Sequence, residues 1–222
     1  MMELYTCKIY YAHFHQPLAK DVFAALVAQL PPEMQDKVAA FQRWEDAHAA
    51  LLSKHILRYA LKENGQAHTL GTMQYTAQSR PYFPGGDDFN ISHTNKIVVC
   101  AFANCNKIGI DIERRVPLDI DIYRQQFSDA EWDHIHRSSD SLQTFYEYRT
   151  AKEAVLKASG TGLKNELHLL NPFENNEWHL YTIRDFSPYS CHLASQQPLG
   201  RISLINLGDL IYKEPDRFIS LL

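Results

Sequence analysis

The segment KIGIDIERR, residues 107–115, is the part of the sequence that decides the fold. Isoleucines stand at every second position of residues 108–112 and alternate with Gly109, Asp111 and Glu113. Successive side chains of a strand point to opposite faces of a sheet. The alternation therefore predicts a strand that buries its isoleucines and presents both carboxylates on the other face. Two interpretations of that face are open: it lies in water, or a cation sits between the carboxylates.

The segments on either side of this strand predict its neighbours. KIVVCAFA, residues 96–103, is another β-rich run, and NCN, residues 104–106, is short enough to join the two runs as a hairpin. On the other side, SDAE, residues 128–131, has capping-box spacing and predicts the start of a short helix. Residues 141–160 show the clearest helical pattern, with Gly160 as the C-cap.

The remaining sequence contains blocks of helix and strand patterns without an internal repeat. These patterns predict strands over 4–14, 72–78, 177–183 and 201–207, helices over 20–30, 31–44 and 45–65, and a proline- and glycine-rich loop over 79–90. Because helices and strands come in blocks rather than in strict βαβ alternation, we expect an α+β fold.

The composition is that of a folded domain. The chain has 222 residues, of which 45% are hydrophobic and 22% charged, and its net charge is −4. No nucleic-acid or membrane partner is therefore expected. No apolar run approaches the roughly 18 residues that span a bilayer, and the first residues lack the pattern of a secretion signal. The four cysteines have no CxxC spacing, which favours reduced thiols and a cytoplasmic location.

A row of charged side chains is expected along the helix of residues 141–160. Residues four apart share a helix face, which places Arg149, Glu153 and Lys157 in one row. One interpretation is a surface ladder of ion pairs, each worth only about 0.3–0.5 kcal/mol. The other is a third carboxylate ligand for a metal, flanked by cations that hold phosphate.

A third polar group lies in SRPYFPGGDDFNISHT, residues 79–94. The loop, followed by NISHT as a short turn, is expected to place Arg80, Ser92 and His93 near strand ends. Arginine makes charge-assisted contacts with phosphate, and the other two side chains add hydrogen-bond donors. The alternative is a solvated loop of turn-forming residues. Ser92 has no GxSxG motif around it, which argues against a serine hydrolase.

Taken in order, RPYFP…FNISHT, GIDIE and KEAVLKASGTGL resemble the 4′-phosphopantetheinyl transferases. The resemblance extends from Arg80 to Leu163, with a weaker likeness over residues 41–61, so it falls within a span, 41–163, of over half of the chain. The chain length favours the larger monomeric branch, which activates carrier proteins of peptide, polyketide and fatty-acid synthesis. The short trimeric holo-acyl-carrier-protein synthases fit less well. The resemblance implies a pseudo-dimer of two similar halves, each a small, mostly antiparallel sheet packed with a long helix, and an active site in the cleft between them.

The same resemblance implies a division of roles. Residues 1–104 are expected to bind the 3′-phosphate and adenosine of coenzyme A, and residues 105–222 to bind Mg²⁺ and pyrophosphate and to carry out the transfer. The implied residues are Asp111, Glu113 and Glu153 for Mg²⁺; Lys157 for the pyrophosphate; Arg80 and Pro81, at the family's GKP position, with Ser92 and His93 for the 3′-phosphate and adenosine; and Lys37 as a further 3′-phosphate cation.

The implied reaction transfers phosphopantetheine from coenzyme A to a serine of an apo acyl or peptidyl carrier protein and releases 3′,5′-ADP. Glu153 is expected to help remove the hydroxyl proton, directly or through a metal-bound water, while Lys157 offsets phosphate charge. Two other functions stay open. One is a Mg²⁺-dependent hydrolase that cleaves the pyrophosphate of coenzyme A or nucleotides, and the other is a non-catalytic module that binds coenzyme A or a carrier protein.

Two residues depart from the family pattern. Arg149 stands where the family has a large aromatic residue, three positions before the lysine of KEA. Tyr148 is no equivalent, because one residue turns a helix by about 100°. Arg149 is expected either to pair with Glu153 or to add a phosphate contact. Met34 stands where a second cation is common, which predicts weaker binding of the 3′-phosphate.

Overall fold

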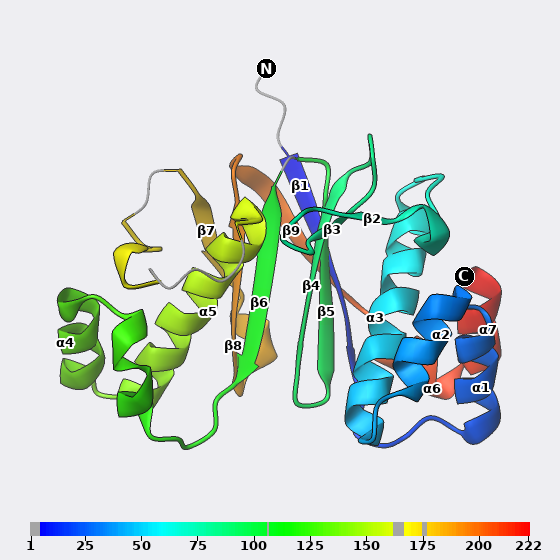
Figure 1. Cartoon of the computed structure of the whole chain (residues 1–222), viewed down its shortest axis with the longest axis horizontal. Helices are drawn as coiled ribbons and strands as arrows, with labels where there is room; N and C mark the ends of the chain where they lie inside the picture. The colour runs from blue at the N-terminus through cyan, green and yellow to red at the C-terminus, as the bar shows by residue number, and fades with distance from the viewer. Residues whose placement is uncertain (1–4, 106, 162–166, 175–176) are drawn as a thin grey trace.

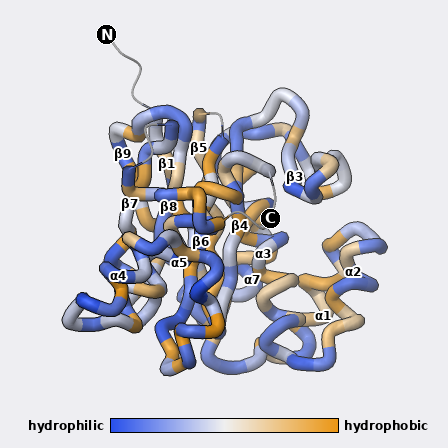
Figure 2. Tube along the Cα trace, turned by 60° about the vertical axis from the view of Figure 1, so that its left-hand side comes forward, coloured by the Kyte–Doolittle hydropathy of each residue, from blue (hydrophilic) through white to orange (hydrophobic). Residues whose placement is uncertain are grey.

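The fold is α+β, as the sequence predicts (Figure 1). The computed structural model describes residues 5–105, 107–161, 167–174 and 177–222. Leu163, at the end of the segment that resembles the transferases, lies outside the described residues. Hydrophobic residues, orange in Figure 2, follow strands of both sheets through the middle of the molecule. Within the described ranges, no helix has the length and apolar character needed to cross a membrane.

The first sheet contains four strands, in the spatial order β4 (Asp88–Thr94), β5 (Ile97–Ala103), β1 (Tyr5–His13) and β9 (Leu199–Asn206). β5 is antiparallel to both β4 and β1, whereas β9 runs parallel to β1. The turn between β4 and β5 consists of Asn95 and Lys96, whose φ angles are 29° and 70°. The short turn predicted at NISHT is therefore wrong: these residues are extended in β4, and the turn follows them.

The second sheet contains three antiparallel strands, in the order β6 (Ile108–Arg114), β8 (Tyr189–Ser195) and β7 (His179–Thr182). β6 is the strand predicted from KIGIDIERR. The hairpin predicted between residues 96–103 and 107–113 is wrong, because β5 and β6 belong to different sheets. β6 pairs along its whole length with β8. No strand was predicted there, since the serine, cysteine and alanine residues of YSCHLAS carry little β-propensity signal.

Helices pack against both sheets (Figure 1). Those on the side of the first sheet are α1 (Lys20–Ala28), α2 (Pro32–Ala39), α3 (Trp44–Glu63), α6 (Gly208–Lys213) and α7 (Pro215–Leu221). On the second sheet lies α5 (Ser141–Ser159), and α4 (Asp129–Arg137) packs against α5. The helices predicted over 20–30, 31–44, 45–65 and 141–160 are confirmed, as is the capping box that opens α4.

Short elements make the connections. The 3₁₀ segments are η1 (Leu70–Thr72), η2 (Ile120–Gln126), η3 (Leu167–Leu169) and η4 (Arg184–Phe186). Only two residues of the strand predicted over 72–78 are extended, as β2 (Gln74–Tyr75), which pairs with β3 (Pro81–Tyr82).

The two sheets share one apolar cluster. The three isoleucines of β6 pack there with residues of the first sheet such as Ile9, Ile97 and Val99. The predicted burial of the isoleucine face is thus confirmed. On the opposite face of the first sheet, a separate core includes residues of α3, and on the opposite face of the second sheet, α5 packs against β6 and β8.

The chain returns to the first sheet near its end. β9 pairs with β1, and Leu207, Ile211 and Phe218 join the core under α3. Residues 199–222 therefore pack with the first half, although they fall in the range 105–222 expected to form the second half. The division of functional roles at residue 104 stays a prediction, as does the likeness of the two halves.

Gly109 determines how closely α5 approaches β6. A Cβ at position 109 would lie 2.1 Å from the Ala154 carbonyl oxygen and 2.3 Å from the Ala158 nitrogen. Only glycine leaves room for the helix backbone to lie directly on the strand. This contact brings Glu153 and Lys157 of α5 next to the carboxylate face of β6.

Candidate active site

The edges of the two sheets are joined by side chains. Asp88, Asn90 and Ser92 stand at alternate positions of β4 and accept hydrogen bonds, over 2.7, 3.0 and 3.4 Å, from the backbone N–H groups of Ile108, Ile110 and Ile112. This side-chain ladder sets the register between β4 and β6. It places Ser92 beside the carboxylates that β6 presents to α5.

Lys157 is held by groups from both sheets. Its Nζ lies 2.6 Å from Asp111 Oδ1, 2.9 Å from Ser92 Oγ and 3.2 Å from the Ile110 carbonyl oxygen. Ser92 in turn donates to Asp111 Oδ1 over 3.0 Å. Asp111 is only 5% exposed, and its Oδ2 is buried without a hydrogen-bond partner in the part of the chain that the structure describes. The interpretation of this carboxylate face as a surface in water is therefore wrong.

The other two carboxylates are less firmly held. Thr94 Oγ1 donates to Glu113 Oε2 over 3.0 Å, whereas Glu153 makes no hydrogen bond or ion pair with any described residue. Burial and the neighbouring charge of Asp111 raise the pKa of both Glu113 and Glu153. The interpretation of α5 as a surface ladder of ion pairs is wrong as well, because Lys157 pairs with Asp111 of β6 and not with Glu153.

Two adjoining cavities collect most of the predicted site residues. The first, called the acidic cavity below, has a volume of ≈ 270 Å³ and is lined by Ile91, Ser92, His93, Asp111, Glu113, Arg149, Glu153 and Lys157. The second, of ≈ 260 Å³, contains Arg80 and Pro81 in its lining and shares Ile91, Glu153 and Lys157 with the first. The two cavities thus bring together predicted site residues that come from both sheets and from α5.

Arg80 is used mainly to connect the two sheets. Its Nη2 donates to Asp88 Oδ2 over 2.7 Å and to the Ile108 carbonyl over 2.9 Å, and its Nε donates to the Lys157 carbonyl over 3.0 Å. The guanidinium therefore has few donors left for a ligand. The predicted contact with the 3′-phosphate stays a prediction.

A basic group lies on the side of the first sheet. Lys37 is exposed on α2 and lines neither cavity. Lys54, on α3, is a further cation that was not predicted from the sequence. Burial and the charge of Lys37 lower the pKa of Lys54. The charge of Lys54 in turn contributes to lowering the pKa of His93. The signal in the sequence was a single lysine within residues 51–57. In the structure, the other six side chains of this segment are buried.

The carboxylates fit a hard divalent cation by their chemistry. As they stand, no three His, Cys, Asp or Glu side chains of the described ranges are arranged to hold a metal ion. The donor set of Asp111, Glu113 and Glu153 is nevertheless all oxygen, which Mg²⁺ prefers. Asp111 Oδ2 has no hydrogen-bond partner among the described residues, and after burial the charge of Asp111 is the next cause of the raised pKa of both glutamates. A cation would relieve this repulsion between carboxylates.

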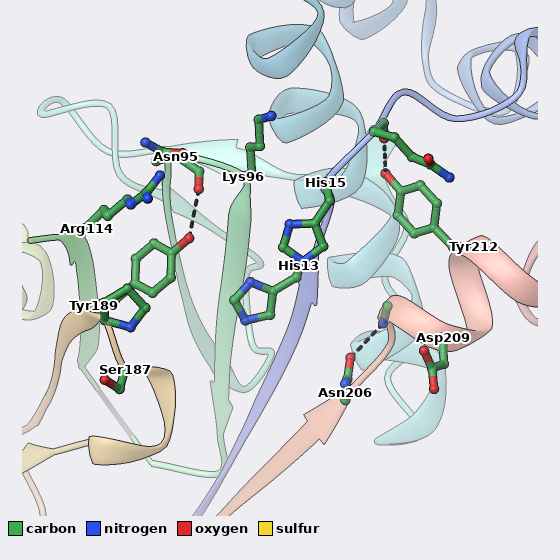
Figure 3. A pocket seen from close by; sticks show the side chains of 13 residues that line it. His13, His15, Asn95, Lys96, Arg114, Ser187, Tyr189, Asn206, Asp209 and Tyr212 are labelled. Atoms are coloured by element: carbon green, nitrogen blue, oxygen red, sulfur yellow. Dashed lines mark hydrogen bonds between the residues drawn. The ribbon is translucent and has the colours of Figure 1, made fainter. Parts of the chain in front are cut away.

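A larger cavity lies elsewhere among the described residues. This histidine cavity has a volume of ≈ 740 Å³, and its lining includes His13, His15 and Arg114 but none of the predicted site residues (Figure 3). It is formed at the ends of strands from both sheets, with α6 on one side. Cavity volume alone would therefore not identify the site residues that the sequence predicts.

Comparison with known proteins shows which family the chain belongs to. A model of the 4′-phosphopantetheinyl transferase superfamily matches residues 107–203, which include β6 and α5. The 4′-phosphopantetheinyl transferase Sfp of Bacillus subtilis is 32% identical over 162 residues, covering 70% of this chain and 71% of the relative. The chain belongs to the 4′-phosphopantetheinyl transferase family. All three carboxylates and Lys157 of this phosphopantetheinyl transferase lie within the matched segment.

Other transferases show the breadth of the similarity. The 4′-phosphopantetheinyl transferase gsp of Aneurinibacillus migulanus is 30% identical over 147 residues, which cover 65% of this chain and 62% of the relative. The human L-aminoadipate-semialdehyde dehydrogenase-phosphopantetheinyl transferase is 28% identical over 164 residues, covering 65% and 52%. The enzyme class predicted from the sequence, a phosphopantetheinyl transferase, is confirmed.

Proposed function

We propose that this phosphopantetheinyl transferase moves the 4′-phosphopantetheine group of coenzyme A to a serine hydroxyl of an apo acyl or peptidyl carrier protein, with Mg²⁺, and releases 3′,5′-ADP. The observation that carries this proposal is the acidic cavity. Three carboxylates, with Arg149 and Lys157, line one small space in a chain of this family. Such a mixture of charges suits a pyrophosphate bound together with a cation.

Glu153 is the proton acceptor of the proposed reaction. The serine oxygen attacks the β-phosphorus of coenzyme A, the bond from that phosphorus to the bridging oxygen of the α-phosphate breaks, and 3′,5′-ADP leaves. The hydroxyl proton passes to Glu153. Two features support this role: the carboxylate is not engaged by other described side chains, and its raised pKa brings it closer to the working pH.

The remaining side chains hold charge in place. Asp111, Glu113 and Glu153 would hold Mg²⁺, which when bound supplies positive charge next to the pyrophosphate. Lys157, fixed by Asp111 and Ser92, offsets negative charge on the phosphates. Because the Lys157 ammonium is already held in place, it does not need to rearrange during the reaction.

The 3′-phosphate and adenosine are proposed to bind on the side of the first sheet. Lys54, which acts on the pKa of His93, joins Lys37 there as a cation. Arg80 and Pro81 line the adjoining cavity. We also propose that the enzyme works as a monomer, as its resemblance to the larger branch of the family implies, and that its location is the cytoplasm.

The test uses intact masses of carrier proteins. The purified enzyme is mixed with coenzyme A, Mg²⁺ and several apo carrier proteins, beside the variants Glu153→Gln and Glu147→Gln. Glu147 lies on the same helix but does not line the acidic cavity. We expect one phosphopantetheinyl group to be added by the unmodified enzyme and by Glu147→Gln, and not by Glu153→Gln.

Two other outcomes overturn the proposal. Cleavage of coenzyme A without any acceptor identifies a pyrophosphate hydrolase. Binding of coenzyme A without modification of any carrier identifies a non-catalytic binding module.

A further inference from the structure

Arg149 occupies an unusual place at the acidic cavity. It lies on α5 one turn before Glu153 and lines the cavity together with all three carboxylates. Its guanidinium carbon lies 5.1 Å from the centroid of the Tyr123 ring. This cation–π contact holds the guanidinium plane without using its hydrogen-bond donors.

The structure excludes one of the two partners expected for Arg149. An ion pair with Glu153 is absent, and across the described ranges the guanidinium makes no hydrogen bond or ion pair at all. Its charge still opposes the upward pKa shifts of Glu113 and Glu153, so it lies within electrostatic reach of both. The five N–H donors of Arg149 are therefore open to a ligand in the cavity.

The other two cations of the cleft are already engaged. Lys157 donates to Asp111, Ser92 and a backbone carbonyl, and Arg80 donates to Asp88 and two backbone carbonyls. An arginine with open donors matches the planar arrangement of phosphate oxygens better than a lysine does. Arg149 is thus the cation best able to form new phosphate contacts among the described residues that line the two cavities.

The order of side chains along α5 indicates which phosphate Arg149 meets. Arg80 and Gly160 lie at the adjoining cavity, Glu153 and Lys157 line both cavities, and Arg149 lines only the acidic one. If the adenosine end of coenzyme A binds on the side of Arg80, Arg149 stands beyond Glu153, at the opposite end of the row. That end is where the reacting phosphate must meet the proton acceptor.

We propose that Arg149 donates hydrogen bonds to the β-phosphate of coenzyme A, the group that is transferred. This inference rests on the proposed function and adds to it a residue that binds the transferred phosphate. Tyr123 is the positioning residue that keeps the guanidinium directed into the cavity.

The experiment compares two ligands that differ at the β-phosphate. Coenzyme A carries both phosphates of the pyrophosphate, whereas 3′,5′-ADP keeps the α-phosphate and the 3′-phosphate but lacks the β-phosphate. Calorimetric titrations with each ligand, in EDTA and again with Mg²⁺, are made on the unmodified enzyme, Arg149→Gln, Arg149→Lys and the control Arg137→Gln. Arg137 is exposed on α4, where it pairs with Asp133.

We expect Arg149→Gln to weaken coenzyme A binding about tenfold or more, the usual size of a charge-assisted hydrogen bond, and to change 3′,5′-ADP binding less than about twofold. Arg149→Lys should retain part of the affinity, and Arg137→Gln all of it. Equal weakening for both ligands, or no weakening for either, overturns the assignment. If the unmodified enzyme still modifies carrier proteins in that case, the proposed function stands and only the role of Arg149 fails.

Discussion

The histidine cavity and the acidic cavity differ in the interactions that their polar side chains make. In the larger histidine cavity, the hydroxyls of Tyr189 and Tyr212 donate to backbone carbonyls over 3.0 and 3.2 Å (Figure 3). Asp209, which also lines this cavity, pairs with Lys213 over 3.0 Å. In the acidic cavity, carboxylates crowd together, and Glu153 has no partner in the described parts of the chain. Crowded carboxylates in a small space, rather than volume, therefore mark the candidate active site.

The largest expected effect comes from removing one charge from the acidic cavity. Asp111→Asn loses the ion pair that fixes Lys157 and one proposed Mg²⁺ ligand, so the rate of carrier modification should fall by about 10²–10³-fold. Asp209→Asn, a carboxylate of the histidine cavity, is the matched control and should change the rate less than twofold, roughly. A comparable loss for both variants would remove the distinction between the cavities.

The next effect concerns the packing that builds the acidic cavity. Gly109→Ala forces a Cβ against the backbone of α5, and we expect about 2–3 kcal/mol of lost stability in urea unfolding. Gly71→Ala is the control, because a Cβ there meets nothing closer than 3.8 Å. A Gly109→Ala protein as stable as the control would show that α5 can move away from β6 without cost.

A pH effect distinguishes a buried histidine near the acidic cavity from a histidine of the larger one. His192 lies opposite Asp111 in the register of β6 and β8. Burial lowers the pKa of His192 to about 4. Since its unfolded pKa is about 6.5, the unfolded state binds more protons between these values, and stability should fall as pH drops from about 6.5 to 4. Above about pH 6.5 this contribution is constant.

The measurement is the free energy of unfolding at several pH values. His192→Gln should reduce the loss of stability between pH 6.5 and 4 by about 2 kcal/mol, while His13→Gln, at the half-buried His13, should change it less. His55, whose pKa is also lowered to about 4, should leave part of the slope in place. An unchanged slope in His192→Gln would contradict the assignment.

The smallest effect is expected in the histidine cavity itself. His15 is exposed, and its ring stacks on His13 with centroids 5.9 Å apart. His15→Asn should change stability by no more than about 0.5 kcal/mol and carrier modification less than twofold, roughly. A tenfold loss of transfer would instead bring the larger cavity into the reaction.

Local sequence patterns determined the elements that carry the site. Period-two alternation identified β6 and its carboxylate face, and the helical pattern ending at Gly160 identified α5 with Glu153 and Lys157 on one side. These features depend on neighbours two to four residues apart, whose relative directions the backbone geometry settles by itself. The order of the family motifs added the enzyme class.

The tertiary structure alone decided the partners. β6 pairs with β8, about 80 residues away in the chain, because long-range pairing and not loop length chooses strand neighbours. Lys152 and Lys157 have the same chemistry, yet Lys152 is buried against Glu131 at 2.8 Å whereas Lys157 lines the acidic cavity. A side chain's use depends on which distant groups share its space, and no local pattern records that.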